Sequence, residues 1–125
     1  MHRGVKALSA STLIDNGVRN PAGEDLGDIE ELMIDMNSGR IAYAVLSFDG
    51  FLGLGGKLFA IPWDALSLDT EEHKFVLNVD REQLENAPGF DKDNWPQTPG
   101  DDDGDAWLVE VYDYYGYRPY WRETR

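Results

Sequence analysis

A glycine-rich loop at residues 50–57 is the first segment whose residue types could do chemistry, because such loops can bind phosphate. A phosphate-binding loop that ended at Lys57 would need glycine at 51 and Ser or Thr at 58, but the chain has Phe51 and Leu58. No helix is expected after the loop to direct its N–H groups at a phosphate. The loop therefore predicts a turn between strands. Its apolar residues, which either fold back onto the core or form a docking surface, are Phe51, Leu52 and Leu54.

Acidic residues gather at 101–105, Asp-Asp-Asp-Gly-Asp, a composition similar to that of a calcium-binding loop. An EF-hand loop that began at Asp101 would need a bidentate glutamate at 112, where this chain has Tyr112. Adjacent carboxylates such as Glu30 and Glu31 point to opposite faces of a strand, so they do not form a catalytic pair. The acidic segment therefore favours a solvated linker over a cation site.

The other reactive residue types are scarce in this chain. It has no cysteine, which excludes thiol nucleophiles, disulfides and Cys-ligated metals, and its two histidines are His2 and His73. We therefore expect no enzyme activity, no cofactor and no metal site. Residues 1–10 lack the apolar stretch of about 7–15 residues that a signal peptide needs, so the cytoplasm is the expected compartment.

The charge balance restricts the partners. The chain has 125 residues, with 11 Lys and Arg against 24 Asp and Glu, which gives a net charge of −13. Such a chain would repel phosphate backbones and anionic membrane surfaces, so neither nucleic acid nor direct membrane insertion is expected. A hydrophobic content of 42% is sufficient for the core of a single folded domain.

Two strands joined by a tight turn are predicted in the first half of the chain. Residues 26–36 alternate, with Leu32, Ile34 and Met36 on one face. Ile29 is out of phase with this set, which predicts a bulge near Glu30. After a turn at 37–40, residues 41–48 are apolar at nearly every position, so this strand is expected to be buried on both faces.

Further short elements follow in the middle of the chain. A strand at 58–61 should end at Pro62, and residues 63–66 are enough for one helical turn. Residues 66–68 and 75–79 are expected to form a hairpin, and a short helix with an acidic cap should begin at 80 and end before Pro88. Five or six short strands with frequent turns predict a mostly β small barrel or sandwich with one or two short helices.

The composition changes after Gly89, because nine of the fifteen aromatic residues lie in the last 37 positions. Residues 107–115 fit both a strand and one face of a helix, and we favour a helix that begins after a capping Asp105. Residues 116–121 are expected to be extended because Pro119 restricts its neighbour. The segment packs either on its own barrel or on a neighbouring subunit.

An ordered series of motifs in this chain resembles a known family. The motifs read ASTLI at 10–14, VRN at 18–20, GEDLGDIEEL at 23–32, DMNSG at 35–39, AVLSFDGFLGLGG at 44–56 and FAIPW at 59–63. Over residues 6–88 the chain resembles the PRC-barrel family, named for the cytoplasmic domain of the photosynthetic reaction-centre H subunit. APGFDKDNWP at 87–96 and YYGYRPYW at 114–121 are similar to a stand-alone bacterial branch of that family.

The resemblance implies a small, bent antiparallel β-barrel that serves as a protein-interaction module and has no enzymatic activity. Relatives include the reaction-centre subunit and the ribosome maturation factors. The membrane helix of the first and the separate N-terminal domain of the second are missing from this sequence, so neither function is transferred. The resemblance supplies no catalytic residues.

We therefore predict a PRC-barrel domain at residues 1–88 and an acidic, aromatic-rich C-terminal extension at 89–125. The protein is expected to self-associate, with a dimer as the first choice, and to dock a protein partner. The residues predicted to form the interaction surface are Phe51, Leu52, Leu54, Trp107, Tyr112, Tyr115, Tyr117, Tyr120 and Trp121. The alternative is a protein that binds a small ligand or a divalent cation at the barrel mouth and the acidic loops.

Overall fold

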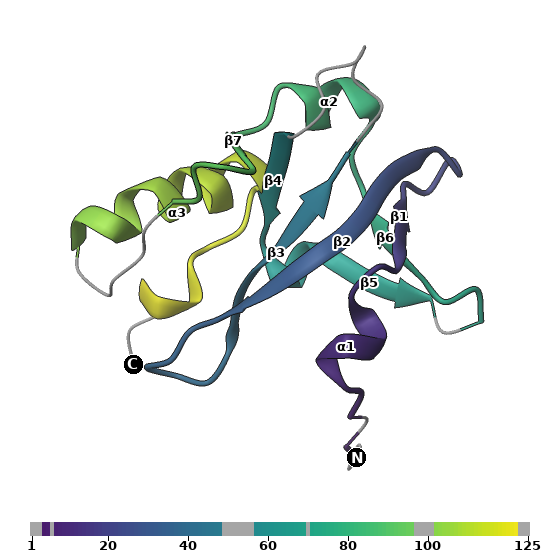
Figure 1. Cartoon of the computed structure of the whole chain (residues 1–125), viewed down its shortest axis with the longest axis horizontal. Helices are drawn as coiled ribbons and strands as arrows, with labels where there is room; N and C mark the ends of the chain where they lie inside the picture. Colours follow the sequence, from purple (N-terminus) through teal and green to yellow (C-terminus); the bar gives the residue numbers. More distant parts are fainter. Residues whose placement is uncertain (1–3, 6, 49–56, 70, 97–101, 123–125) are drawn as a thin grey trace.

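In the computed structural model of the chain, the described residues form seven short strands that make one mixed, curved sheet (Figure 1). The structure describes residues 4–5, 7–48, 57–69, 71–96 and 102–122. Hydrogen bonds join the strands in the order β5-β6-β1-β2-β3-β4-β7. The strands are β1 (Gly17–Arg19), β2 (Asp25–Ile34), β3 (Ile41–Ser47), β4 (Lys57–Ile61), β5 (Leu66–Asp69), β6 (Lys74–Leu77) and β7 (Gly89–Asp91).

Short helices connect these strands and follow them. They are α1 (Ala10–Leu13), the 3-10 turn η1 (Trp63–Ala65), α2 (Arg81–Glu85), α3 (Asp102–Tyr115) and the 3-10 turn η2 (Tyr120–Arg122). The mostly β, barrel-like prediction is confirmed, although the described residues form seven strands and three α-helices where five or six strands and one or two short helices were predicted. The sheet does not close, because β5 and β7 remain as edges, and β1 pairs with β6 in parallel while the other pairs are antiparallel.

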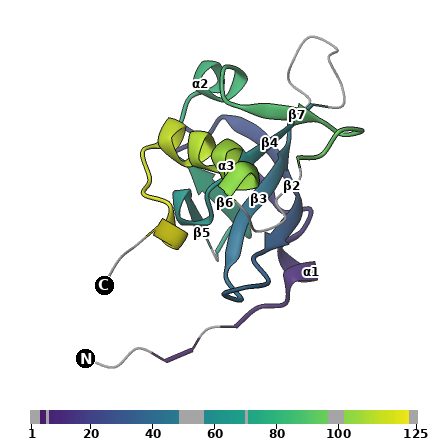
Figure 2. The same ribbon diagram turned by 90° about the vertical axis from the view of Figure 1, so that its left-hand side faces the viewer.

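Strand β3 is buried on both faces, as the continuous apolar run at 41–48 predicts, and β4 is buried on both faces as well. Ala44 and Leu46 of β3 point into the inner core of the curved sheet. Tyr43 and Val45 alternate with them and belong to a second, outer cluster that includes Val111 of α3. Figure 2 shows α3 lying across the outer side of β3 and β4. Each strand therefore separates two apolar layers, and α3 keeps the outer layer from water.

The hairpin between β2 and β3 differs in one respect from the sequence-based prediction. The predicted bulge is confirmed, since the register shifts between Ile29 and Glu31. Leu32 is buried, but Ile34 and Met36, which the alternation placed on the same face, are 48% and 87% exposed. The register of β2 against β3 shifts a second time between Met33 and Ile34, so the alternation does not continue in phase, and Met36 lies beyond the end of β2.

Helix α2 begins where the acidic cap predicted. The side chain of Asp80 accepts a hydrogen bond from the backbone N–H of Gln83 at 2.7 Å, and the Gln83 side chain accepts one from the backbone N–H of Asp80 at 3.0 Å. This reciprocal pair is a capping box, which satisfies N–H groups that the first turn leaves free. Leu84 then places the helix on the inner core.

The C-terminal extension is helical, as favoured, with corrected boundaries. Helix α3 begins at Asp102, three residues before the predicted cap at Asp105. Residues 120–122 form a 3-10 turn, which overlaps the end of the segment 116–121 that was predicted to be extended. The extension also supplies strand β7, which pairs antiparallel with β4. Residues beyond 88 thus add both an edge strand and an outer helix to the sheet.

Candidate functional site

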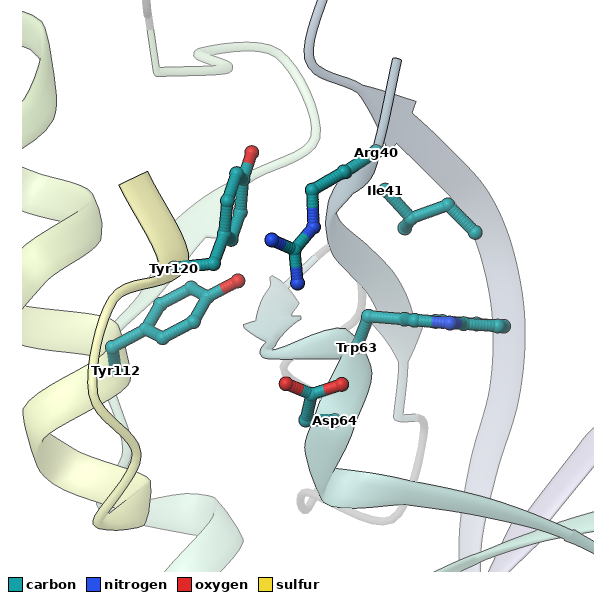
Figure 3. A pocket seen from close by; sticks show the side chains of 6 residues that line it. All are labelled: Arg40, Ile41, Trp63, Asp64, Tyr112 and Tyr120. Carbon is teal, nitrogen blue, oxygen red and sulfur yellow. The ribbon is translucent and has the colours of Figure 1, made fainter. Parts of the chain in front are cut away.

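A pocket of about 250 Å³ opens where the C-terminal extension meets the barrel (Figure 3). Four segments build it: the start of β3, the turn η1, helix α3 and the turn η2. Its lining residues are Arg40, Ile41, Trp63, Asp64, Tyr112 and Tyr120. The pocket thus combines one cation, one carboxylate, two phenols and an apolar wall.

Arg40 is held in place by the ring of Tyr120, which is itself hydrogen-bonded to the carboxylate of Asp35. Its guanidinium carbon lies 4.4 Å from the centre of the Tyr120 ring, a cation–π contact. The Tyr120 hydroxyl donates a hydrogen bond to Oδ2 of Asp35 at 2.7 Å, and Ser38 donates to the same oxygen at 3.0 Å. The hydrogen bond from Tyr120 is the main reason why the pKa of Asp35 lies below its ordinary value. Burial and this bond raise the pKa of Tyr120 in return.

Tyr112 lines the pocket together with the two charged residues. Its hydroxyl donates to the backbone oxygen of Ala42 at 2.6 Å. The pKa of Tyr112 is raised to about 12, mainly by burial, with Asp64 adding to the rise and Arg40 opposing it. Both charges are therefore close enough to act on the same hydroxyl. In the described part of the chain Arg40 and Asp64 form no ion pair with each other or with another residue.

The hydrogen bond from Tyr120 to Asp35 makes a pH-dependent contribution to stability. Because the folded pKa of Asp35 is lowered, this contribution is present above the ordinary value of 3.8 and is lost as the pH falls through the folded value. Tyr120→Phe removes the donor, so we expect the free energy of unfolding to fall by about 1 kcal/mol at neutral pH. We also expect the acid-induced loss of stability below about pH 4 to become smaller.

Urea unfolding at a series of pH values measures both effects. Tyr117→Phe is the matched control, because it removes an exposed tyrosine hydroxyl from the same segment. Identical pH profiles for the two variants would contradict a stabilising bond between Tyr120 and Asp35.

The structure places the predicted tail residues in three different environments. Tyr112 and Tyr120 line the pocket. Trp107, Tyr115 and Trp121 pack in the outer cluster, where Trp107 meets Tyr43 edge-on and Trp121 meets Tyr112 edge-on at centroid separations of 5.6 and 5.1 Å. Tyr117 is 38% exposed. Phe51, Leu52 and Leu54 lie outside the described residues, and the docking role of all nine residues stays a prediction.

Sequence reasoning missed the pocket residues that come from the barrel. Trp63 and Asp64 were expected only to form a helical turn, and Arg40 only to belong to a hairpin turn. The signal that could have found them is their residue type. Arginine and tryptophan are enriched at binding surfaces, and here both lie in turns of an acidic chain, where solvation alone does not require them.

An apolar groove of about 510 Å³ lies next to the pocket. Ile41 and Trp63 line both hollows, so they form the wall between them. The ring of Trp63 is fixed edge-on against Phe75, with the centroids 5.8 Å apart. The other residues lining the groove are Ala7, Leu8, Leu13, Leu66, Leu68 and Phe75.

A family model described as "PRC-barrel domain" matches residues 6–84. The chain belongs to the PRC-barrel family. Among curated proteins, none matches the sequence of this chain. Within this PRC barrel the pocket combines two sources, because Arg40, Trp63 and Asp64 come from the matched domain and Tyr112 and Tyr120 from beyond it.

Two further observations bear on what this PRC barrel could bind. In the described ranges, no helix has both the length and the apolar character needed to cross a membrane. Among those same residues, His, Asp and Glu side chains do not gather in a group of three or more that could hold a metal ion.

Proposed function

We propose that this PRC-barrel protein is a non-catalytic assembly module of the cytoplasm that self-associates as a dimer and docks a protein partner. The observation that carries the proposal is the apolar tip of the β2–β3 hairpin. Ile34 and Met36 are 48% and 87% exposed on a protein of net charge −13. Apolar side chains that project from an acidic surface are typical of a binding region.

The C-terminal turn extends this surface. Asp35 lies between the two exposed residues and accepts the hydrogen bond from Tyr120, so the hairpin and η2 are in contact. Tyr117 lies just before this turn and is exposed, and tyrosine is enriched at protein interfaces. A stable interface buries about 800 Å² per partner, more than the hairpin tip alone provides. We therefore place the hairpin and the residues 117–121 in one docking surface.

Static light scattering on the unmodified chain and on a variant of the hairpin tests this proposal. The unmodified chain is expected to scatter as a species twice the 14.1 kDa monomer, and Ile34→Lys with Met36→Lys is expected to reduce it to the monomer. Val5→Lys with Leu8→Lys is the control, since it adds the same two charges at exposed apolar residues outside the hairpin. Added salt should strengthen the dimer, because it screens the repulsion between two acidic chains.

Two outcomes would contradict the proposal. A mass of 14.1 kDa for the unmodified chain at every concentration would remove self-association. A dimer that survives the double substitution would remove the hairpin from the interface.

A further inference from the structure

We propose that the pocket beside Trp63 binds a small zwitterion, namely an α-amino acid with an apolar side chain. In this complex the guanidinium of Arg40 would bind the carboxylate of the amino acid, and the carboxylate of Asp64 would bind its ammonium group. Ile41 and Trp63 would contact the side chain of the ligand. The proposal concerns a binding activity and does not depend on the dimer.

The guanidinium of Arg40 is held in a fixed position. One face of the Arg40 guanidinium is covered by the Tyr120 ring at 4.4 Å, and Tyr120 is itself tied to Asp35. The N–H edges of the guanidinium remain available, and no carboxylate of the described residues lies within ion-pair distance of them. A planar guanidinium with free edges suits bidentate binding of a carboxylate.

A carboxylate, that of Asp64, lies on the other side of the pocket. Asp64 lies on η1, and in Figure 3 its carboxylate faces the space below the Arg40 guanidinium. The opposite effects of Arg40 and Asp64 on the pKa of Tyr112 place both charges near one hydroxyl. Two opposite charges that share a pocket without neutralising each other fit a ligand that carries both signs.

The overall charge of the protein supports the same ligand class. A purely anionic ligand would approach a chain of net charge −13 against repulsion, and a purely cationic one would meet Arg40 inside the pocket. A zwitterion has no net charge, so it avoids the long-range repulsion and satisfies both local charges.

Size and wall chemistry define the rest of the molecule. Pockets for drug-sized ligands usually measure about 300–1,000 Å³, so the 250 Å³ here suits a smaller molecule. Ile41 and Trp63 form an apolar wall that continues into the neighbouring groove. An apolar side chain would therefore lie along this wall, and we expect leucine and phenylalanine to bind more tightly than glycine.

Calorimetry with ligands that each lack one charge tests the proposal. L-leucine is expected to bind, while N-acetyl-L-leucine, which lacks the ammonium group, and L-leucinamide, which lacks the carboxylate, should each bind at least about tenfold more weakly. In a heteronuclear NMR spectrum the indole N–H signal of Trp63 should shift on addition of L-leucine, which locates the ligand.

Variants of the two charged residues complete the test. Arg40→Met and Asp64→Asn should each weaken L-leucine binding at least about tenfold. Arg81→Met is the matched control, because Arg81 also lies over an aromatic ring, that of Phe48 at 5.3 Å, but lines neither hollow. Circular dichroism and thermal melting check that all three variants fold.

Several results would overturn the proposal. No heat and no Trp63 shift with millimolar leucine or phenylalanine would remove amino-acid binding. Equal binding of leucine and N-acetyl-leucine would show that the protein recognises only the carboxylate of the ligand. Equal losses in Arg40→Met and Arg81→Met would show that the pocket is not where the ligand binds.

Discussion

Replacing Gly27 with alanine is expected to lower the free energy of unfolding by about 3 kcal/mol or more. Gly27 lies in β2 with φ at +114°, a backbone conformation that residues with a side chain rarely adopt. An added Cβ would stand 2.1 Å from the backbone oxygen of Ser47 in β3. The clash is with backbone, so relief requires β2 and β3 to separate.

Gly39→Ala is the control for the cost of placing alanine at a positive φ without a steric clash. Gly39 has φ at +80°, but no heavy atom lies within 4 Å of the position its Cβ would take. Its substitution should therefore cost only about 1 kcal/mol. Urea unfolding followed by circular dichroism measures both values. Equal costs for the two variants would contradict the close approach of β2 to β3.

Val111→Asp is expected to destabilise the protein by at least about 3 kcal/mol and to release α3 from the sheet. Val111 is fully buried in the outer cluster, where it packs with Tyr43 and Val45 of β3. A carboxylate there would lose its hydration without gaining a partner. Released from the sheet, the helix would leave the outer face of β3 exposed to water.

Ala106→Asp adds the same charge to an exposed position of the same helix, so its effect should stay within about 0.5 kcal/mol. Urea unfolding followed by tryptophan fluorescence compares the two, since Trp107 and Trp121 belong to the outer cluster. If the two variants were equally stable, α3 would not pack on the sheet of its own chain.

Local patterns in the sequence predicted much of the fold. The apolar run at 41–48 indicated a strand buried on both faces, and this is correct because α3 covers the outer face. Asp80 indicated the start of α2, since a cap depends on residues only three positions apart. Alternation placed Leu32, Ile34 and Met36 on one face, but it did not show the second register shift, between Met33 and Ile34, and only Leu32 is buried.

The pocket could be predicted only in part. Tyr112 and Tyr120 were singled out because aromatic residues are concentrated after Gly89. Arg40 and Asp64 were not, because they approach these tyrosines only when α3 and η2 pack on the barrel. No spacing within the sequence predicts that approach, because it depends on packing between distant segments. Tyr112 and Ala42, for example, form a hydrogen bond although they are 70 positions apart.

The most direct test of the proposed function is a methyl NOE experiment on a mixture of isotope-labelled and unlabelled chains. It detects only contacts between copies, so it tests self-association and the docking surface together. The account predicts intermolecular NOEs to the methyl groups of Ile34 and Met36, which project from the β2–β3 hairpin. The absence of intermolecular NOEs, or NOEs confined to residues such as Val5 outside this surface, would contradict it.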